Sequence, residues 1–331
     1  MTNKKLLILS IIALSSLASC NETPAQTLSI ICPTGAPSLA FYDQGANENF
    51  ETNSQTANVL ATLKTDETME NYKDIVIFDS VTGLKTIKAD GDHKYSLASI
   101  ITGGNFYLVS LTKDADENGN IPMPSEGDKI VSFGKGLIPD LVYSKLAKDY
   151  WHINNTPTYV TGNVANTKSV IMTGKFESET VDYVFTAEPI LTAAKASADE
   201  SVKSKIKVVK NIRSEWKAYS GQDALAQAGV FVSKYALENK KSELETFLSE
   251  LKARQDDCVN NVTKVVATLD AFGDKDAQTT KFGFNSTLVN NLQKDGKNSF
   301  GIVSSNENID VNAFLTSLGQ ETFTDDYFVN L

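Results

Sequence analysis

Small polar residues and glycines follow several short apolar runs in this 331-residue chain, at points where a strand would turn into a helix. Glycine lets a ligand approach the backbone closely, and hydroxyl and amide side chains add neutral hydrogen bonds. Any one such loop is more often a tight turn or a helix cap. Together they predict a small-molecule site formed by Thr34, Gly35, Ala36, Ser80, Thr102, Gly103, Asn105, Gly134, Lys135, Gly136, Asn163 and Glu188.

Two of these residues carry a charge, and each has a second interpretation. Lys135 stands between two glycines ahead of a predicted helix, where it would meet an anion with help from the helix dipole or else point into solvent. Glu188 ends a predicted strand, where it would accept hydrogen bonds from an amine or aminopyrimidine or else cap the next helix. The sequence leaves both pairs of alternatives open.

Aromatic residues near the same loops offer faces on which a planar ring can stack. Phe106 and Phe133 are among them, but most strand aromatics are expected to fill the core. Tyr42 and Tyr143 are the aromatic contacts that we predict.

The chain has only two arginines, Arg213 and Arg254, and neither lies in a predicted ligand loop. A bidentate arginine clamp for a sulfonate or phosphonate is therefore not expected, unless Arg213 reaches the site from a hinge. This favours a neutral or heteroaromatic ligand over a sulfonate.

Residues that catalysis would need are sparse. His93 and His152 have no histidine, cysteine or carboxylate partner at a metal-ligand spacing, and both are expected at the solvated surface. The sequence holds no G-x-S-x-G, Walker or H-E-x-x-H motif. We therefore expect no enzymatic activity, no cofactor and no metal.

Short apolar runs alternate with helix-period segments along the chain, which predicts an α/β fold built on largely parallel sheets. In such sheets ligands bind beyond the carboxyl ends of the strands, where loops lead into helices. The predicted strands are 28–32, 74–78, 105–111, 129–133, 158–161, 181–186, 206–209 and 230–232. The predicted helices include 36–42, 56–64, 138–150, 166–173, 190–198 and 240–269.

The helix predicted over 240–269 carries the strongest periodic pattern. Its apolar residues fall largely on one face, which indicates a core-facing stripe. Cys258 lies on this stripe and is expected to behave as a small buried hydrophobe. A bridge between Cys258 and Cys32, which lies in a predicted strand, stays open.

The chain begins like an exported protein. Lys4 and Lys5 precede an apolar run over 6–17, about a dozen residues and too short to span a bilayer. The Leu-Ala-Ser-Cys set that ends at Cys20 resembles a bacterial lipobox. The resemblance implies that residues 1–19 are removed as a signal peptide and that Cys20 is diacylated, so that 20–27 form a lipidated linker. A short N-terminal helix with an incidental cysteine is the alternative.

Overall charge argues against two classes of partner. Lys and Arg number 31 against 41 Asp and Glu, a net charge of −10. Nucleic acid and the anionic face of a bilayer are both disfavoured electrostatically. We expect a monomer held at the membrane by lipid alone.

The order of several segments resembles the substrate-binding lipoproteins of ABC importers in the nitrate, sulfonate, taurine and thiamine-precursor group. These segments are GKGLIPDLVYSKL, a Gly162-Asn163 turn, MTGKFESETVDYVFTAEPILTAAK and GVFVSKYALENKKSELETFLSELKARQDDCVNN. The resemblance covers 28–318. It implies a type II periplasmic-binding-protein fold, in which two α/β lobes joined by two crossover strands close on one small molecule.

The order of the predicted strands and helices agrees with this picture, and it predicts that 28–112 and 217–318 form the first lobe, 113–216 the second, and 319–331 a solvated tail. The resemblance implies a receptor on the outer face of the bacterial cytoplasmic membrane that delivers its ligand to an ABC permease. The loop residues and the scarcity of arginine, rather than the resemblance, favour a thiamine-precursor-like heteroaromatic as the ligand. A sulfonate or nitrate receptor, a surface lipoprotein without a transporter, and an enzyme on the same fold remain alternatives.

Overall fold

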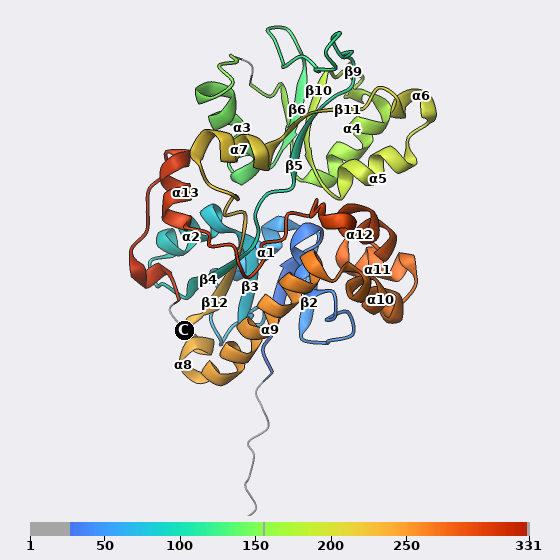
Figure 1. The fold of residues 1–331 in the computed structure, drawn as a ribbon. Helices are drawn as coiled ribbons and strands as arrows, with labels where there is room; N and C mark the ends of the chain where they lie inside the picture. The colour runs from blue at the N-terminus through green and yellow to red at the C-terminus, as the bar shows by residue number, and fades with distance from the viewer. Residues whose placement is uncertain (1–26, 155, 330–331) are drawn as a thin grey trace, which may run out of the picture.

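Two five-stranded sheets form the framework of the computed structural model, which describes residues 27–154 and 156–329 (Figure 1). The predicted signal peptide and Cys20 lie outside the described residues. No helix in the described ranges combines the length and apolar character needed to cross a membrane.

The first sheet has the strand order β2-β1-β3-β12-β4 and lies in the lower part of Figure 1. Its strands β1, β2 and β3 are parallel, and β12 runs antiparallel between β3 and β4. We call the structure around this sheet the first lobe. The strands are β1 (Ile30–Pro33), β2 (Phe50–Asn53), β3 (Ile75–Asp79), β4 (Tyr95–Thr102) and β12 (Ala228–Ser233).

The second sheet has the order β11-β5-β10-β6-β7 and forms the second lobe, in the upper part of the figure. Here β10, β6 and β7 are parallel, whereas β5 pairs antiparallel with β10 and β11. Its strands are β5 (Phe106–Ser110), β6 (Ile130–Phe133), β7 (Tyr159–Thr161), β10 (Tyr183–Ala187) and β11 (Lys207–Asn211). A small hairpin, β8 (Lys175–Phe176) and β9 (Glu179–Thr180), lies outside both sheets.

The strand predicted at 105–111 was assigned to the first lobe, but β5 belongs to the second sheet. The chain passes between the sheets at 103–105, directly after β4. Apolar periodicity shows that a segment is a strand without showing which sheet it joins, because pairing depends on distant segments. Strands β2 and β4 were missed, since both are sheet edges with partly exposed residues.

Helices cover both sheets. Those of the first lobe or its C-terminal extension are α1 (Thr56–Thr62), α2 (Ser80–Asp90), α8 (Lys234–Asn239), α9 (Lys241–Asn260), α10 (Val262–Phe272), α11 (Lys275–Phe282), α12 (Ser286–Gln293) and α13 (Val311–Leu318). Those of the second lobe are α3 (Ile138–Asp149), α4 (Thr167–Thr173), α5 (Ile190–Ser197), α6 (Glu200–Lys203) and α7 (Ile212–Ser220). The predicted helix 36–42 is a 3-10 helix, η1 (Ala36–Phe41).

The single helix predicted over 240–269 is two helices, because Asn261 leaves helical geometry with φ −134° and ψ 47°. The predicted stripe is nevertheless buried in α9 and α10, at Leu244, Phe247, Leu251 and Leu269 among others. Apolar spacing continues across the break, so it does not reveal the break.

The C-terminal segment is not a solvated tail. Phe323 and Tyr327 are buried, and the backbone N–H of Val329 donates to the Leu97 carbonyl of β4 at 2.9 Å. Phe328 also forms an isolated bridge with Leu97. The segment therefore covers part of the exposed edge of β4, which would otherwise leave backbone groups unpaired.

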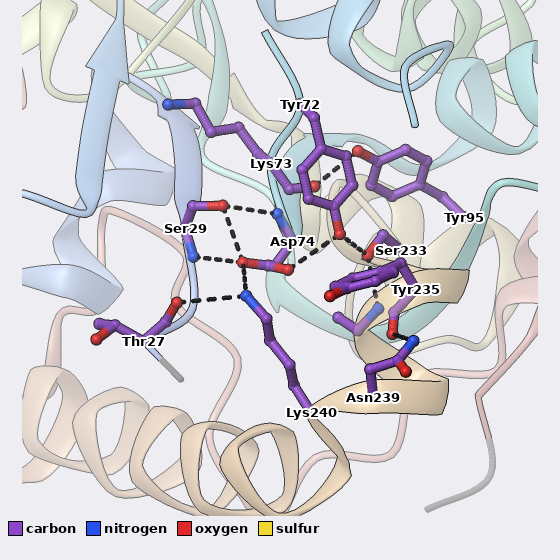
Figure 2. Close-up of polar contacts among 11 residues, drawn as sticks. Thr27, Ser29, Tyr72, Lys73, Asp74, Tyr95, Ser233, Tyr235, Asn239 and Lys240 are labelled. Atoms are coloured by element: carbon purple, nitrogen blue, oxygen red, sulfur yellow. Dashed lines mark hydrogen bonds and ion pairs between the residues drawn. The ribbon is translucent and has the colours of Figure 1, made fainter. Parts of the chain in front are cut away.

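A buried polar cluster holds the beginning of β1 to β3 and to α9 (Figure 2). One carboxylate oxygen of Asp74 accepts from the backbone N–H and hydroxyl of Ser29 and from Lys240 Nζ, at 2.7, 2.9 and 3.0 Å. The other accepts from the Tyr72 hydroxyl at 3.0 Å. Since the Tyr72 proton goes to the carboxylate, the Ser233 hydroxyl donates to Tyr72 at 2.6 Å and accepts from the Ala236 N–H at the start of α8.

Cys32 and Cys258 are both buried free thiols. Cys258 is 1 % exposed on α9, as expected for a small buried hydrophobe. Burial raises the pKa of both thiols well above the usual value, so both stay protonated at neutral pH.

These thiols should therefore be unreactive in the folded protein. We expect Ellman's reagent to label neither thiol of the chain from residue 24 to 331 on the time scale of minutes, and to label both in strong denaturant. Mass spectrometry after alkylation provides an independent count. Rapid labelling of either cysteine in the native protein would contradict this expectation.

Candidate functional site

A cavity of about 240 Å³ lies where strand ends from both lobes meet. The first lobe contributes residues at the ends of β1 and β2, among them Thr34 and Asn53. The second lobe contributes residues after β6, β7 and β10, among them Gly134, Asn163 and Glu188. The cavity thus occupies the crevice beyond the carboxyl ends of the parallel strands, where ligands of open α/β sheets bind.

Seven of the residues predicted from the loops line this cavity. They are Thr34, Gly35, Ala36, Asn105, Gly134, Asn163 and Glu188. They come from five separate segments of sequence and from both sheets, so the fold brings them together. A role for each in binding stays a prediction.

Two glycines give this wall its shape. Gly35 has φ +106° and donates its N–H to the Phe282 carbonyl at 2.7 Å. Gly134 has φ +68° and donates to Thr161 at 3.0 Å. Both positive φ values are strained for residues with a Cβ, which explains glycine at these turns.

Three other predicted residues are buried beneath the cavity wall. The Ser80 hydroxyl donates to the Ala226 carbonyl, and Thr102 Oγ1 accepts from the Ala228 N–H at 3.2 Å. Gly103 donates its N–H to the Gly301 carbonyl at 2.6 Å. The turns after β3 and β4 are covered by chain segments more than a hundred residues away in sequence, so they do not face the cavity.

Tyr42 and Tyr143 are core residues and do not line the cavity. Tyr42 donates its hydroxyl to Asp257 at 2.9 Å, and burial, followed by this contact, raises the pKa of its hydroxyl. Tyr143 packs its ring against Phe185, with centroids 5.3 Å apart. Both side chains face inward because large rings are needed to fill the core.

Lys135 and Gly136 are exposed and lie outside the cavity lining, which favours the solvent alternative for Lys135. The Gly136 N–H donates to Asp140 Oδ2 at 2.8 Å, so this turn closes on the first residues of α3.

Glu188 caps the helix that follows it, which was one of the two interpretations that the sequence left open. Its carboxylate accepts from the N–H and the hydroxyl of Thr192, both at 2.9 Å. Burial raises the pKa of this carboxyl, and the Thr192 N–H opposes the shift. Glu188 is 7 % exposed and lines the cavity. When ionised, its carboxyl group gives the cavity wall a negative charge.

No lysine, arginine or histidine is among the described residues of the cavity wall. Arg213 is held by Glu307 and by the Asp223 carbonyl, and Arg254 lies 3.3 Å from Glu250. Neither arginine is placed to clamp an anion in the cavity. An oxoanion would have to bind through neutral donors beside an acidic residue.

The aromatic wall consists of Phe106 and Phe133, whose rings meet edge to face with centroids 5.9 Å apart. Leu137 and Val164 extend this apolar surface. Such a wall suits a planar ring better than a fully hydrated ion.

Sequence reasoning missed Gln227, Asn53, Ser54 and Thr56 on the wall. Gln227 comes immediately before β12, which is antiparallel to β3, so the amino end of β12 faces the cavity. A search of the carboxyl ends of strands alone overlooks such a residue. The other three residues, Asn53, Ser54 and Thr56, are positioned by the edge strand β2, and no local sequence pattern predicted that strand.

No group of three or more His, Cys, Asp or Glu placed to hold a metal ion occurs in residues 27–154 and 156–329.

Several solved structures share this architecture. An ABC transporter protein from Parabacteroides distasonis matches with a TM-score of 0.63 at 16% identity, over 92% of this chain and 99% of that one. The zinc-bound ligand-binding component of an ABC-type import system from Staphylococcus aureus matches with a TM-score of 0.61 at 10% identity, over 92% and 96%. The periplasmic aliphatic sulphonate-binding protein of Escherichia coli matches with a TM-score of 0.58 at 12% identity, over 88% and 85%.

No protein-family model matches the chain, and no curated protein sequence matches it. The structural likeness establishes the fold: two α/β lobes in the arrangement of periplasmic binding proteins, as the resemblance of the sequence segments implied.

Proposed function

We propose that this protein is the extracytoplasmic solute-binding component of an ABC importer, and that it is a receptor without catalytic activity. The observation that carries the proposal is the cavity at which strand ends of both lobes converge. A solute that contacts both lobes stabilises the closed form by its differential affinity for that form, and the permease would recognise this state. Likeness to an ABC transporter protein, to the ligand-binding component of an ABC-type import system and to a periplasmic sulphonate-binding protein supports this proposal.

The lipobox-like sequence at Cys20 supports attachment to the outer face of the cytoplasmic membrane. Residues 21–29 would separate the lipid from the first residue of β1, Ile30. Mass spectrometry of the N-terminal peptide after expression in a bacterium that lipidates exported proteins tests this. A diacylated cysteine at position 20 is the expected result.

For the solute, the wall favours a small planar heteroaromatic molecule, of the kind represented by thiamine-precursor pyrimidines. The wall combines Phe106 and Phe133 with neutral amides and hydroxyls, and its titratable side chain is Glu188. A sulfonate or nitrate is the second candidate, because the sulphonate-binding protein of Escherichia coli shares the fold. The lack of a basic residue on the described wall weighs against that candidate.

Thermal unfolding in the presence of a ligand panel tests the proposal. The chain from residue 24 contains every described element and is screened against pyrimidines, thiamine, riboflavin, taurine, alkylsulfonates and nitrate. A ligand at about 100 times its dissociation constant stabilises the folded form by about 2.7 kcal/mol, a rise of about 5 °C in midpoint for a protein of this size. We expect one chemical class to produce such a rise.

A pair of variants shows whether the shift comes from this cavity. Ala165 is an exposed residue of its wall, and Ala165→Trp should abolish the ligand-induced rise. Ala267 is exposed on α10 away from the cavity, and Ala267→Trp should retain the rise. No rise with any compound of the panel, from a folded protein, would count against a receptor.

A further inference from the structure

A chain of amide hydrogen bonds crosses the cavity wall from one lobe to the other. Gln227, ahead of β12, donates from Nε2 to Asn105 Oδ1 at 3.1 Å. Asn105, in the passage between the sheets, donates from Nδ2 to the backbone carbonyl of Glu188 at 2.5 Å. All three residues line the cavity.

The carbonyl at the end of this chain determines how both amides are oriented. A backbone carbonyl only accepts hydrogen bonds, so the Asn105 NH2 group must face Glu188. Asn105 then presents its oxygen to Gln227, which must answer with its own NH2 group. The amide oxygen of Gln227 is thereby directed away from Asn105. No rotation of either amide improves this arrangement, since it would oppose two acceptors.

This oxygen of Gln227 has no hydrogen-bond partner within the described part of the chain, although it is buried. A buried acceptor without a partner is costly and needs an explanation. The Gln227 backbone is firmly held, since its N–H donates to Thr102 at 3.1 Å and its carbonyl accepts from Ser80 at 3.0 Å. The residue is therefore fixed on the cavity wall with one acceptor left over.

We infer that Gln227 Oε1 determines specificity by accepting a hydrogen bond from an N–H donor of the solute. This inference rests on the proposed function, because it concerns the same cavity. The solute would carry an exocyclic amino group or a primary amide on its ring. Nitrate and ionised sulfonate groups offer acceptors only, so they would leave the oxygen unpaired and place negative charge beside Glu188.

Matched probes that differ in the donor alone test the inference. 4-Aminopyrimidine is compared with 4-methylpyrimidine, and nicotinamide with 3-acetylpyridine, because a methyl group replaces the NH2 group at nearly the same volume. Isothermal titration calorimetry of the full-length chain in detergent gives the dissociation constants. We expect the donor-bearing member of at least one pair to bind ten times more tightly or better, as sites built for a donor reject analogues without it.

Two glutamine variants locate the effect. Gln227→Met keeps the length of the side chain and removes the acceptor, so the preference for the donor should fall to within about threefold. Gln44 is a half-buried glutamine outside the cavity wall with hydrogen bonds to Asp43 and Asn47, and Gln44→Met should keep the full preference.

The outcomes separate this inference from the proposed function. Equal binding of both members of each pair, or a preference that survives in Gln227→Met, overturns the role of Gln227. Binding of nitrate or of alkylsulfonates that carry no amino group, without binding of any donor-bearing probe, overturns it too, while a receptor remains supported. Lack of binding by every compound overturns both. The comparison of probes on the wild-type chain stands even if Gln227→Met does not fold.

Discussion

Replacing Asp74 with alanine should lower the free energy of unfolding by about 3–5 kcal/mol, the usual loss when one partner of a buried ion pair is removed. Asp74 is 1 % exposed and accepts four hydrogen bonds, from Ser29, Tyr72 and Lys240 (Figure 2). The variant leaves the ammonium group of Lys240, whose side chain is 12% exposed, without its carboxylate. Urea unfolding followed by circular dichroism measures the loss.

Further variants identify the cause of the loss at Asp74. Adding Lys240→Met to Asp74→Ala removes the stranded charge, so the double variant should be more stable than Asp74→Ala alone. Asp114 pairs with Lys207 at 2.8 Å but is 95% exposed, and Asp114→Ala should leave the urea midpoint nearly unchanged. Equal losses for Asp74→Ala and Asp114→Ala would refute a special role for the cluster.

Gly301→Ala should cost about 3–4 kcal/mol, from a backbone region unfavourable to alanine and from a clash. Gly301 has φ +68°, and an added Cβ would lie 2.7 Å from the carbonyl carbon of Gly104 and closer still to its oxygen. Gly104 belongs to the passage between the sheets, next to Asn105 of the amide chain. The backbone there must move, so solute binding should weaken as well.

Gly319→Ala is the matched control for Gly301→Ala. Gly319 has nearly the same φ, +70°, but the atom nearest to an added Cβ is the Lys145 ammonium nitrogen at 3.8 Å. The control should therefore lose only about 1–2 kcal/mol, the cost of the left-handed backbone. Urea unfolding gives the stability of both variants, and calorimetry with a bound probe gives their affinity. Similar values for the two variants would show that the approach of Gly301 to Gly104 carries no energetic weight.

Some of the site could be predicted because it depends on local features. Thr34, Gly134 and Glu188 follow directly on apolar runs that are strands in the structure, and all three line the cavity. The rule that ligands meet the carboxyl ends of parallel strands needs only the strand and its direction. It fails for Gln227, which enters the wall from an antiparallel strand.

The sequence by itself determined the α/β class, most strands, and the loops from which seven wall residues come, because apolar periodicity and turn residues act over a few positions. It also carries the lipobox-like signal. Only the tertiary structure decided that β5 joins the second sheet, that Ser80 and Thr102 are covered, and that Gln227 keeps an unpaired oxygen. These features depend on pairing and packing between segments far apart in the chain. Such contacts leave no local pattern in the residues that make them.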